Sequence, residues 1–97
     1  MTLSRVRTRL ASESEALRMH FGVSQLFLFG SVVRKQATPR SDIDLAVEFL
    51  APPTLDRLLD LGDYLEALLG AKVDLVTLSS IRPRVLERIR PEMIRIA

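Results

Sequence analysis

Cysteine is absent from this 97-residue sequence, and histidine occurs only once, at His20. The absence of thiols excludes disulfides, a cysteine nucleophile and thiolate-ligated zinc or iron–sulfur sites. Any bound metal must therefore take oxygen ligands or the single imidazole, and magnesium-type chemistry fits that restriction. Because His20 has no second potential ligand at a useful spacing, we interpret it as a structural residue.

Long apolar runs are also missing. No segment approaches the roughly 20 apolar residues of a membrane span, and the start of the chain lacks the apolar stretch of a signal peptide. We therefore expect no membrane partner and a cytoplasmic location. With 47% hydrophobic and 27% charged residues, the sequence has the composition of one globular domain covering residues 1–97.

Neither sign of charge dominates, since the formal net charge is only +2. Arginines nevertheless gather near both ends of the chain, at Arg5, Arg7 and Arg9 and at Arg82, Arg84, Arg88, Arg90 and Arg95. Acidic residues are interspersed among them and aromatic residues make up only 5% of the chain. This pattern disfavours direct nucleic-acid binding and favours a solvated face or a protein contact, including contact in a homo- or hetero-oligomer.

Apolar residues recur at helical spacing in two long segments, residues 3–21 and 55–69, and each is followed by a glycine that can end a helix. Two shorter helices are expected, one over residues 31–36 and one from residue 79 or 80 onward. Residues 37–41, directly after the first of these short helices, include the proline and serine that are typical of a loop.

Three segments have strand patterns. Residues 25–29 are apolar after Gln25, and residues 42–49 alternate with Asp42 and Asp44 on the polar face. Residues 72–78 are a third short segment with a strand pattern. The apolar tail near the C-terminus is compatible with an edge strand. The order of elements predicts an α/β (α+β) fold, a small mixed β-sheet of three to four strands flanked by helices.

Residues suited to catalysis stand at or near the ends of these strands. Gly30 and Ser31 follow the first strand, Asp42 and Asp44 open the second, and Asp74 lies on the third. If the strands are neighbours, the three carboxylates converge, and a divalent cation relieves the repulsion between them. Each feature alone is more typical of a solvated face, but together they favour a two-metal site for phosphoryl or nucleotidyl transfer.

The Gly-Ser turn has the properties of a phosphate-binding loop. Gly30 allows a phosphate to approach the backbone, the free N–H groups at the start of the next helix favour an anion, and Ser31 adds a hydroxyl donor. Arg34 lies one helical turn later, where it can reach a triphosphate oxygen. An exposed arginine at this position is equally natural without any ligand.

The spacing from Gly30-Ser31 across ten residues to Asp42 and Asp44 resembles the Gly-Ser-X10-Asp-X-Asp signature of the nucleotidyltransferase superfamily, and in particular the MNT-type minimal nucleotidyltransferases. The four fixed residues are expected by chance in a chain of this length on the order of once in a thousand. Asp74 in a later strand strengthens the match. The resemblance extends over essentially the whole chain.

This resemblance implies a polymerase-beta-like nucleotidyltransferase core that uses two Mg²⁺ ions and takes ATP as substrate. Asp42 and Asp44 correspond to metal ligands, and Asp74 is the third carboxylate, which can also accept the proton of the attacking hydroxyl. The residues implied in binding the triphosphate are Gly30, Ser31 and Arg34. One departure concerns the turn, where Lys35 stands at the position that is often glycine in the family, and this bears on turn geometry and nucleotide specificity.

Proteins of the MNT type are typically antitoxins of HEPN-domain ribonuclease toxins, and some AMPylate a tyrosine of the toxin. The resemblance therefore implies the antitoxin of a type VII-like pair, acting as a Mg-dependent protein adenylyltransferase on a hydroxyl, expected to be that of a tyrosine, of its HEPN toxin. Two alternatives stay open. One is a non-catalytic antitoxin that neutralises the toxin by binding, and the other is a nucleotidyltransferase that acts on a small molecule or RNA.

Overall fold

A computed structural model describes residues 2–36 and 42–97, so the loop expected over 37–41 lies outside the described residues. The helices are α1 (Leu3–Ser12), α2 (Ser14–Phe21), α3 (Leu55–Leu69) and α4 (Pro83–Ile89). The strands are β1 (Val23–Phe29), β2 (Ile43–Phe49), β3 (Val73–Thr77) and β4 (Ile94–Arg95). Two short 3₁₀ segments, η1 (Leu78–Ser80) and η2 (Arg90–Glu92), flank α4.

The four strands form one mixed sheet in the order β3-β2-β1-β4. β2 runs antiparallel to β1 and parallel to β3, while β4 pairs antiparallel with the other edge of β1. The expected fold class and the C-terminal edge strand are therefore confirmed. β2 lies between β1 and β3. The three strands that carry or precede the predicted site residues are therefore neighbours in the sheet.

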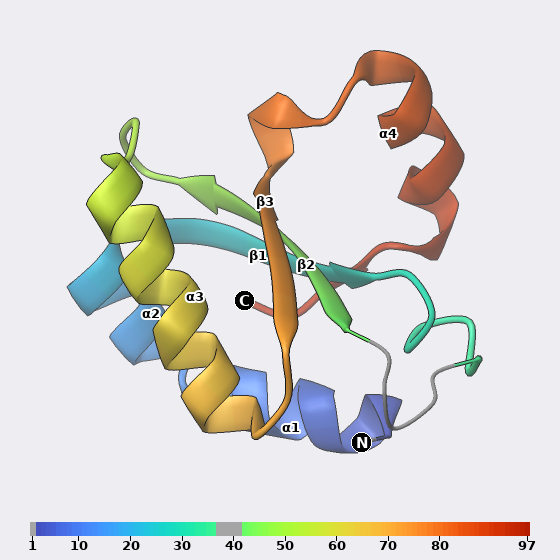
Figure 1. The fold of residues 1–97 in the computed structure, drawn as a ribbon, viewed down its shortest axis with the longest axis horizontal. Coiled ribbons are helices and arrows are strands. Elements are labelled where there is room, and N and C mark those ends of the chain that lie inside the picture. Colours follow the sequence, from blue (N-terminus) through green and yellow to red (C-terminus); the bar gives the residue numbers. More distant parts are fainter. Residues whose placement is uncertain (1, 37–41) are drawn as a thin grey trace.

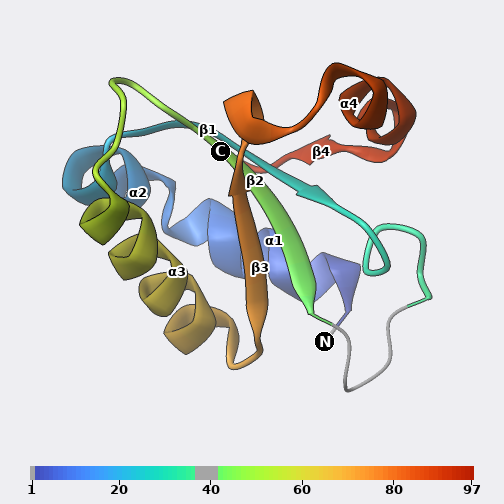
Figure 2. The ribbon, with the colours of Figure 1, turned by 45° about the horizontal axis from the view of Figure 1, so that its top comes forward.

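Helices α1, α2 and α3 lie together on one face of the sheet (Figures 1 and 2). The core between them includes the alternate residues Ile43, Leu45 and Val47 of β2, which are all buried. Leu61 and Leu65 of α3 are fully buried against this layer. Because side chains alternate across a strand, burying the odd-numbered residues of β2 directs its even-numbered residues to the opposite face.

The chain from β3 to β4 crosses from one edge of the sheet to the other, away from the three packed helices (Figure 2). This crossing carries α4, which has no fully buried residue. None of the helices in the described part of the chain has both the length and the apolar character needed to span a bilayer.

Two predicted helix boundaries were wrong. The helix expected over 3–21 is divided at Glu13, where Ser12 Oγ donates to the carbonyl of Arg9 at 2.7 Å and competes with regular helical bonding. The helix expected from residue 79 or 80 begins instead at Pro83, after the 3₁₀ segment η1. Proline is favoured in the first helical turn because its missing N–H has no intrahelical partner there.

The helix expected over 31–36 is only a turn. The N–H of Gln36 donates to the carbonyl of Ser31 at 2.8 Å, and the N–H of Lys35 donates to the carbonyl of Val32 at 3.2 Å. This pair of bonds ends a helix, and it requires the left-handed conformation that Lys35 adopts, with φ of 59°. The segment therefore turns back after a single helical turn.

Candidate active site

Asp44 stands at the centre of the candidate site, on the sheet face opposite the core. Its backbone pairs with Phe29 of β1 on one side and with Asp74 of β3 on the other. Residues paired across neighbouring strands point to the same face, at a strand separation of about 4.8 Å. The structure therefore places Asp44 and Asp74 side by side, and Asp42, two residues earlier, precedes them on the chain.

Gly30 brings the backbone of the Gly-Ser turn against this carboxylate. Its φ is +80°, a conformation that L side chains rarely adopt. A Cβ atom at position 30 would collide with Asp44 Oδ2 and lie 2.9 Å from Asp44 Cγ. Only glycine allows the turn and the aspartate to approach so closely.

The electrostatics of Asp44 indicate a site suited to a cation. Burial raises the pKa of Asp44, and the neighbouring carboxylates of Asp74 and Asp42 raise it further. The charge of Arg34 lowers the pKa of Asp44, whereas that of Glu92 raises it. Because all three aspartates interact electrostatically and offer only hard oxygen donors, the donor set fits a divalent ion such as Mg²⁺.

The backbone brings these aspartates together more closely than their side chains do. Within residues 2–36 and 42–97, no three Asp, Glu or His side chains are gathered tightly enough to hold a metal ion together. Asp74 is exposed, whereas Asp44 is partly buried. The carboxylates of Asp44 and Asp74 therefore lie on one face of the sheet without forming a closed ligand set.

Arg34 pairs with a residue that the sequence analysis did not single out. Its Nη1 atom donates to Glu92 at 3.1 Å from Oε2 and 3.2 Å from Oε1. The pairing of β4 with β1 explains the meeting, because the antiparallel pair Leu28–Ile94 brings the segment before β4, which carries Glu92, next to the turn after β1. In the sequence, only the apolar C-terminal tail pointed toward this contact. Even that signal required assuming which strand the tail pairs with and in which direction.

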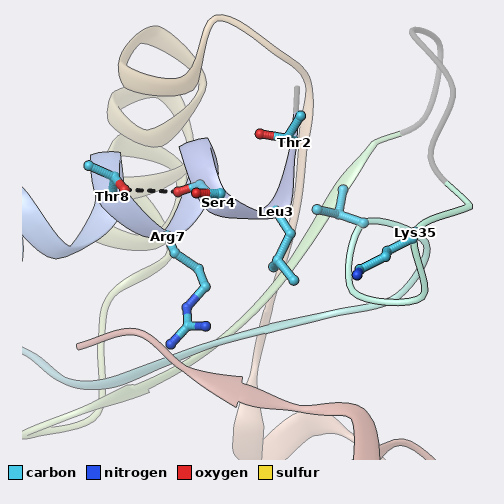
Figure 3. Close-up of a pocket in the computed structure, with 7 residues that line it drawn as sticks. Thr2, Leu3, Ser4, Arg7, Thr8 and Lys35 are labelled. Carbon is cyan, nitrogen blue, oxygen red and sulfur yellow. Dashed lines mark hydrogen bonds between the residues drawn. The ribbon is translucent and has the colours of Figure 1, made fainter.

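A cavity of about 660 Å³ lies away from the carboxylates, between α1 and the turn after β1. Thr2, Leu3, Ser4, Arg7 and Thr8 line one side, and Val32 and Lys35 line the other (Figure 3). The candidate catalytic residues take no part in its lining. The candidate site on the polar face of β2 is therefore separate from the lining of this cavity.

Comparison with known proteins identifies the family of the chain. Residues 5–96 match the family described as a nucleotidyltransferase domain. The protein adenylyltransferase MntA of Thermococcus cleftensis is 38% identical over 94 residues, which cover 97% of this chain and 95% of that protein. The family resemblance inferred from the sequence motif is confirmed.

Solved structures extend the similarity to the whole fold. A structure described as a candidate minimal nucleotidyltransferase has a TM-score of 0.81 and 36% identity, covering 97% of this chain and 95% of that one. A complex of tri-AMPylated Shewanella oneidensis HEPN toxin with an MNT antitoxin matches with a TM-score of 0.67. That match has 20% identity and covers 94% of this chain and 71% of that one, so it shows a shared fold. The chain belongs to the nucleotidyltransferase family, in its minimal form, and its enzymatic class is that of a nucleotidyltransferase.

Proposed function

We propose that this chain is an antitoxin that transfers AMP from ATP to a hydroxyl, that of a tyrosine, on a HEPN-type toxin. Its similarity to MntA, over almost the full length of both proteins, supports the adenylyltransferase activity. The fold shared with the MNT antitoxin in complex with an AMPylated HEPN toxin supports the choice of partner.

One structural observation carries the proposal. The backbone of the Gly30-Ser31 turn packs directly against Asp44, which in turn pairs in register with Asp74. A triphosphate held on the turn would therefore lie beside the carboxylates. Because the turn and the carboxylates belong to neighbouring strands of the same sheet, the sheet fixes the distance between them.

Asp42 and Asp44 are the residues that would hold two Mg²⁺ ions, with Asp74 as the third carboxylate. When bound, the ions neutralise charge on the triphosphate and stabilise the attacking and leaving oxygens. The turn supplies backbone N–H groups and the Ser31 hydroxyl to the phosphates. Arg34 adds a positive charge at the same side of the site.

The reaction is a substitution at the α-phosphorus of ATP. The acceptor oxygen forms a bond to this phosphorus, the bond to the oxygen bridging to the β-phosphate breaks, and pyrophosphate leaves. The acceptor loses its proton, and the proposal assigns Asp74 to accept it, a role that its exposure supports. The products are AMP-protein, pyrophosphate and one proton.

The deciding experiment incubates the pure protein with labelled ATP, Mg²⁺ and the product of its neighbouring gene, which the proposal expects to be a HEPN protein. We expect label on the partner with the wild type and none with Asp42→Asn/Asp44→Asn. Glu48→Gln is the matched control, because Glu48 lies on the same strand but is exposed and accepts from Ser24 Oγ at 2.9 Å. Tight binding of the partner without label transfer would contradict catalysis and favour neutralisation by binding alone.

A further inference from the structure

We propose that Glu92 is a positioning residue for Arg34, holding its guanidinium beside the aspartates and turned toward the triphosphate. This inference rests on the proposed function, because it assigns Glu92 a part in ATP binding. It concerns a residue far from the nucleotidyltransferase motif, on the 3₁₀ segment η2 that precedes β4.

The contacts of Arg34 restrain its side chain from two sides. Nη1 lies between the two carboxylate oxygens of Glu92, at 3.1 and 3.2 Å, and Nε donates to Gln36 Oε1 at 3.3 Å. The side chain of Glu92 is only 20% exposed, whereas that of Arg34 is 49% exposed. The carboxylate is therefore the fixed partner, and the arginine is the one that presents a surface to solvent.

The donors that remain on Arg34 are suited to an incoming ligand. Among the described residues, Nη2 donates to no protein oxygen. The Nη2 group can donate to a phosphate oxygen, and an arginine already held in place loses less rotamer freedom when it does so. Glu92 thus removes part of the entropic cost of binding a triphosphate.

Glu92 also keeps Arg34 from pairing with the aspartates. Arg34 belongs to the same turn as Gly30, because its backbone N–H donates to the Gly30 carbonyl at 3.1 Å, and Gly30 lies against Asp44. An arginine at that range without another partner is attracted to the carboxylate cluster, where it would compete with a divalent cation for Asp44. The ion pair with Glu92 provides the alternative partner and leaves the aspartates available.

The test measures binding of a non-hydrolysable ATP analogue with Mg²⁺ to the full chain by isothermal titration calorimetry, without any partner protein. Glu92→Ala is expected to raise Kd about five- to tenfold, because Arg34 becomes mobile and is drawn toward Asp44. Glu92→Gln keeps one acceptor oxygen and should recover part of the affinity. Glu87→Ala is the matched control, because Glu87 is an exposed acid on the same C-terminal segment, and its Kd should stay within twofold.

A double-mutant cycle separates positioning from a purely structural role. In an Arg34→Ala background, Glu92→Ala should not weaken binding of the analogue any further, because the residue that Glu92 positions is absent. A structural role would instead produce the same loss of affinity in both backgrounds. Melting temperatures of all variants are measured alongside, and if Glu92→Ala folds poorly, Glu92→Gln supplies the comparison with its own cycle.

The possible failures are distinguishable. If the wild type binds the analogue and Glu92→Ala binds it equally well or more tightly, Glu92 does not position Arg34, while the proposed function stands. If the wild type itself does not bind the analogue, both the positioning role and the proposed function are overturned. A higher Kd that depends on Arg34 supports the inference.

Discussion

The two faces of strand β2 differ in what their residues contribute. On one face, Ile43, Leu45 and Val47 are buried beneath three helices and make contacts of the kind that stabilise any small domain. On the other, Asp44 is partly buried among other charges, under conditions that raise its pKa and oppose its ionised form. Successive residues of one strand therefore have opposite effects on stability: the odd-numbered ones stabilise the fold, and the ionised aspartate, the proposed metal ligand, destabilises it.

The largest expected effect comes from Asp44→Asn. Because Asp44 is the residue shared by the turn and the carboxylate cluster, its loss should lower AMP transfer by about three orders of magnitude or more, equivalent to several kcal/mol of lost charge stabilisation. The measurement is label transfer to the HEPN partner under saturating ATP. A variant retaining more than about a tenth of wild-type transfer would move the centre of the site away from Asp44.

The same substitution should not lower stability. Since the pKa of Asp44 is raised in the folded protein, the folded state binds the proton more tightly than the unfolded chain does. This contribution to stability is present below the ordinary carboxyl pKa and is lost as pH rises through the raised value. At pH 7, with a chelator present, Asp44→Asn should therefore unfold at an equal or higher denaturant concentration, and its advantage should shrink toward pH 4. A large loss of stability at pH 7 would contradict this account.

Leu45→Ala tests the adjacent residue on the opposite face. Leu45 is fully buried, and removing it should lower the free energy of unfolding by about 3 kcal/mol, through lost burial and the cavity left behind. Transfer activity per folded molecule should stay near that of the wild type, provided that the assay temperature is below the lowered melting temperature. Denaturant unfolding and the label-transfer assay together check both parts. Loss of activity in a fully folded Leu45→Ala protein would show that the two faces are not independent.

Gly30→Ala compares two glycines with similar backbones and different neighbours. Gly30 and Gly70 have φ of +80° and +63°, so alanine incurs the left-handed penalty of about 1 kcal/mol at both. Only at position 30 does the added Cβ also collide with Asp44. We expect Gly70→Ala to lower the free energy of unfolding by about 1 kcal/mol and keep activity, and Gly30→Ala to lower it further and reduce transfer at least tenfold. Equal effects of the two variants on transfer would argue against a close turn–aspartate contact as a requirement for catalysis.

Local pattern was sufficient for much of this site. The alternation over residues 42–49 predicted which side chains of β2 face the core, and the Gly-Ser turn and Asp74 were assigned to strand ends that the structure brings together. The assignment of faces succeeded because it depends on the period of one strand, whereas the meeting of the turn and the aspartates also needed the three strands to be neighbours. The three carboxylates were expected to converge, and their backbones do so, but the grouping of their side chains around ions stays a prediction.

Contacts between residues far apart in the sequence could not be predicted from local sequence patterns. Glu92 meets Arg34 only because β4 pairs antiparallel with β1, a choice of partner and direction that no local pattern encodes. The contact of Glu13 is likewise with a distant residue, since its carboxylate accepts from the Tyr64 hydroxyl at 2.8 Å. Ser31 is a favourable residue for the start of a helix, so the sequence predicts a helix over 31–36. The left-handed conformation of Lys35, which ends the turn, is not encoded by that local signal.

The smallest expected effect comes from Lys35→Gly, which tests the departure from the family's usual turn. Lys35 occupies a left-handed position with φ of 59°, where glycine carries no Cβ penalty. The substitution should raise the free energy of unfolding by about 0.5–1 kcal/mol, after allowing for the greater entropy of glycine in the unfolded chain, and raise the melting temperature by about 2–8 °C. Lys35→Ala is the control, because it removes the same amine but keeps the Cβ. If alanine stabilises as much as glycine does, the lysine charge opposes folding; if only glycine does, the cost lies in the backbone.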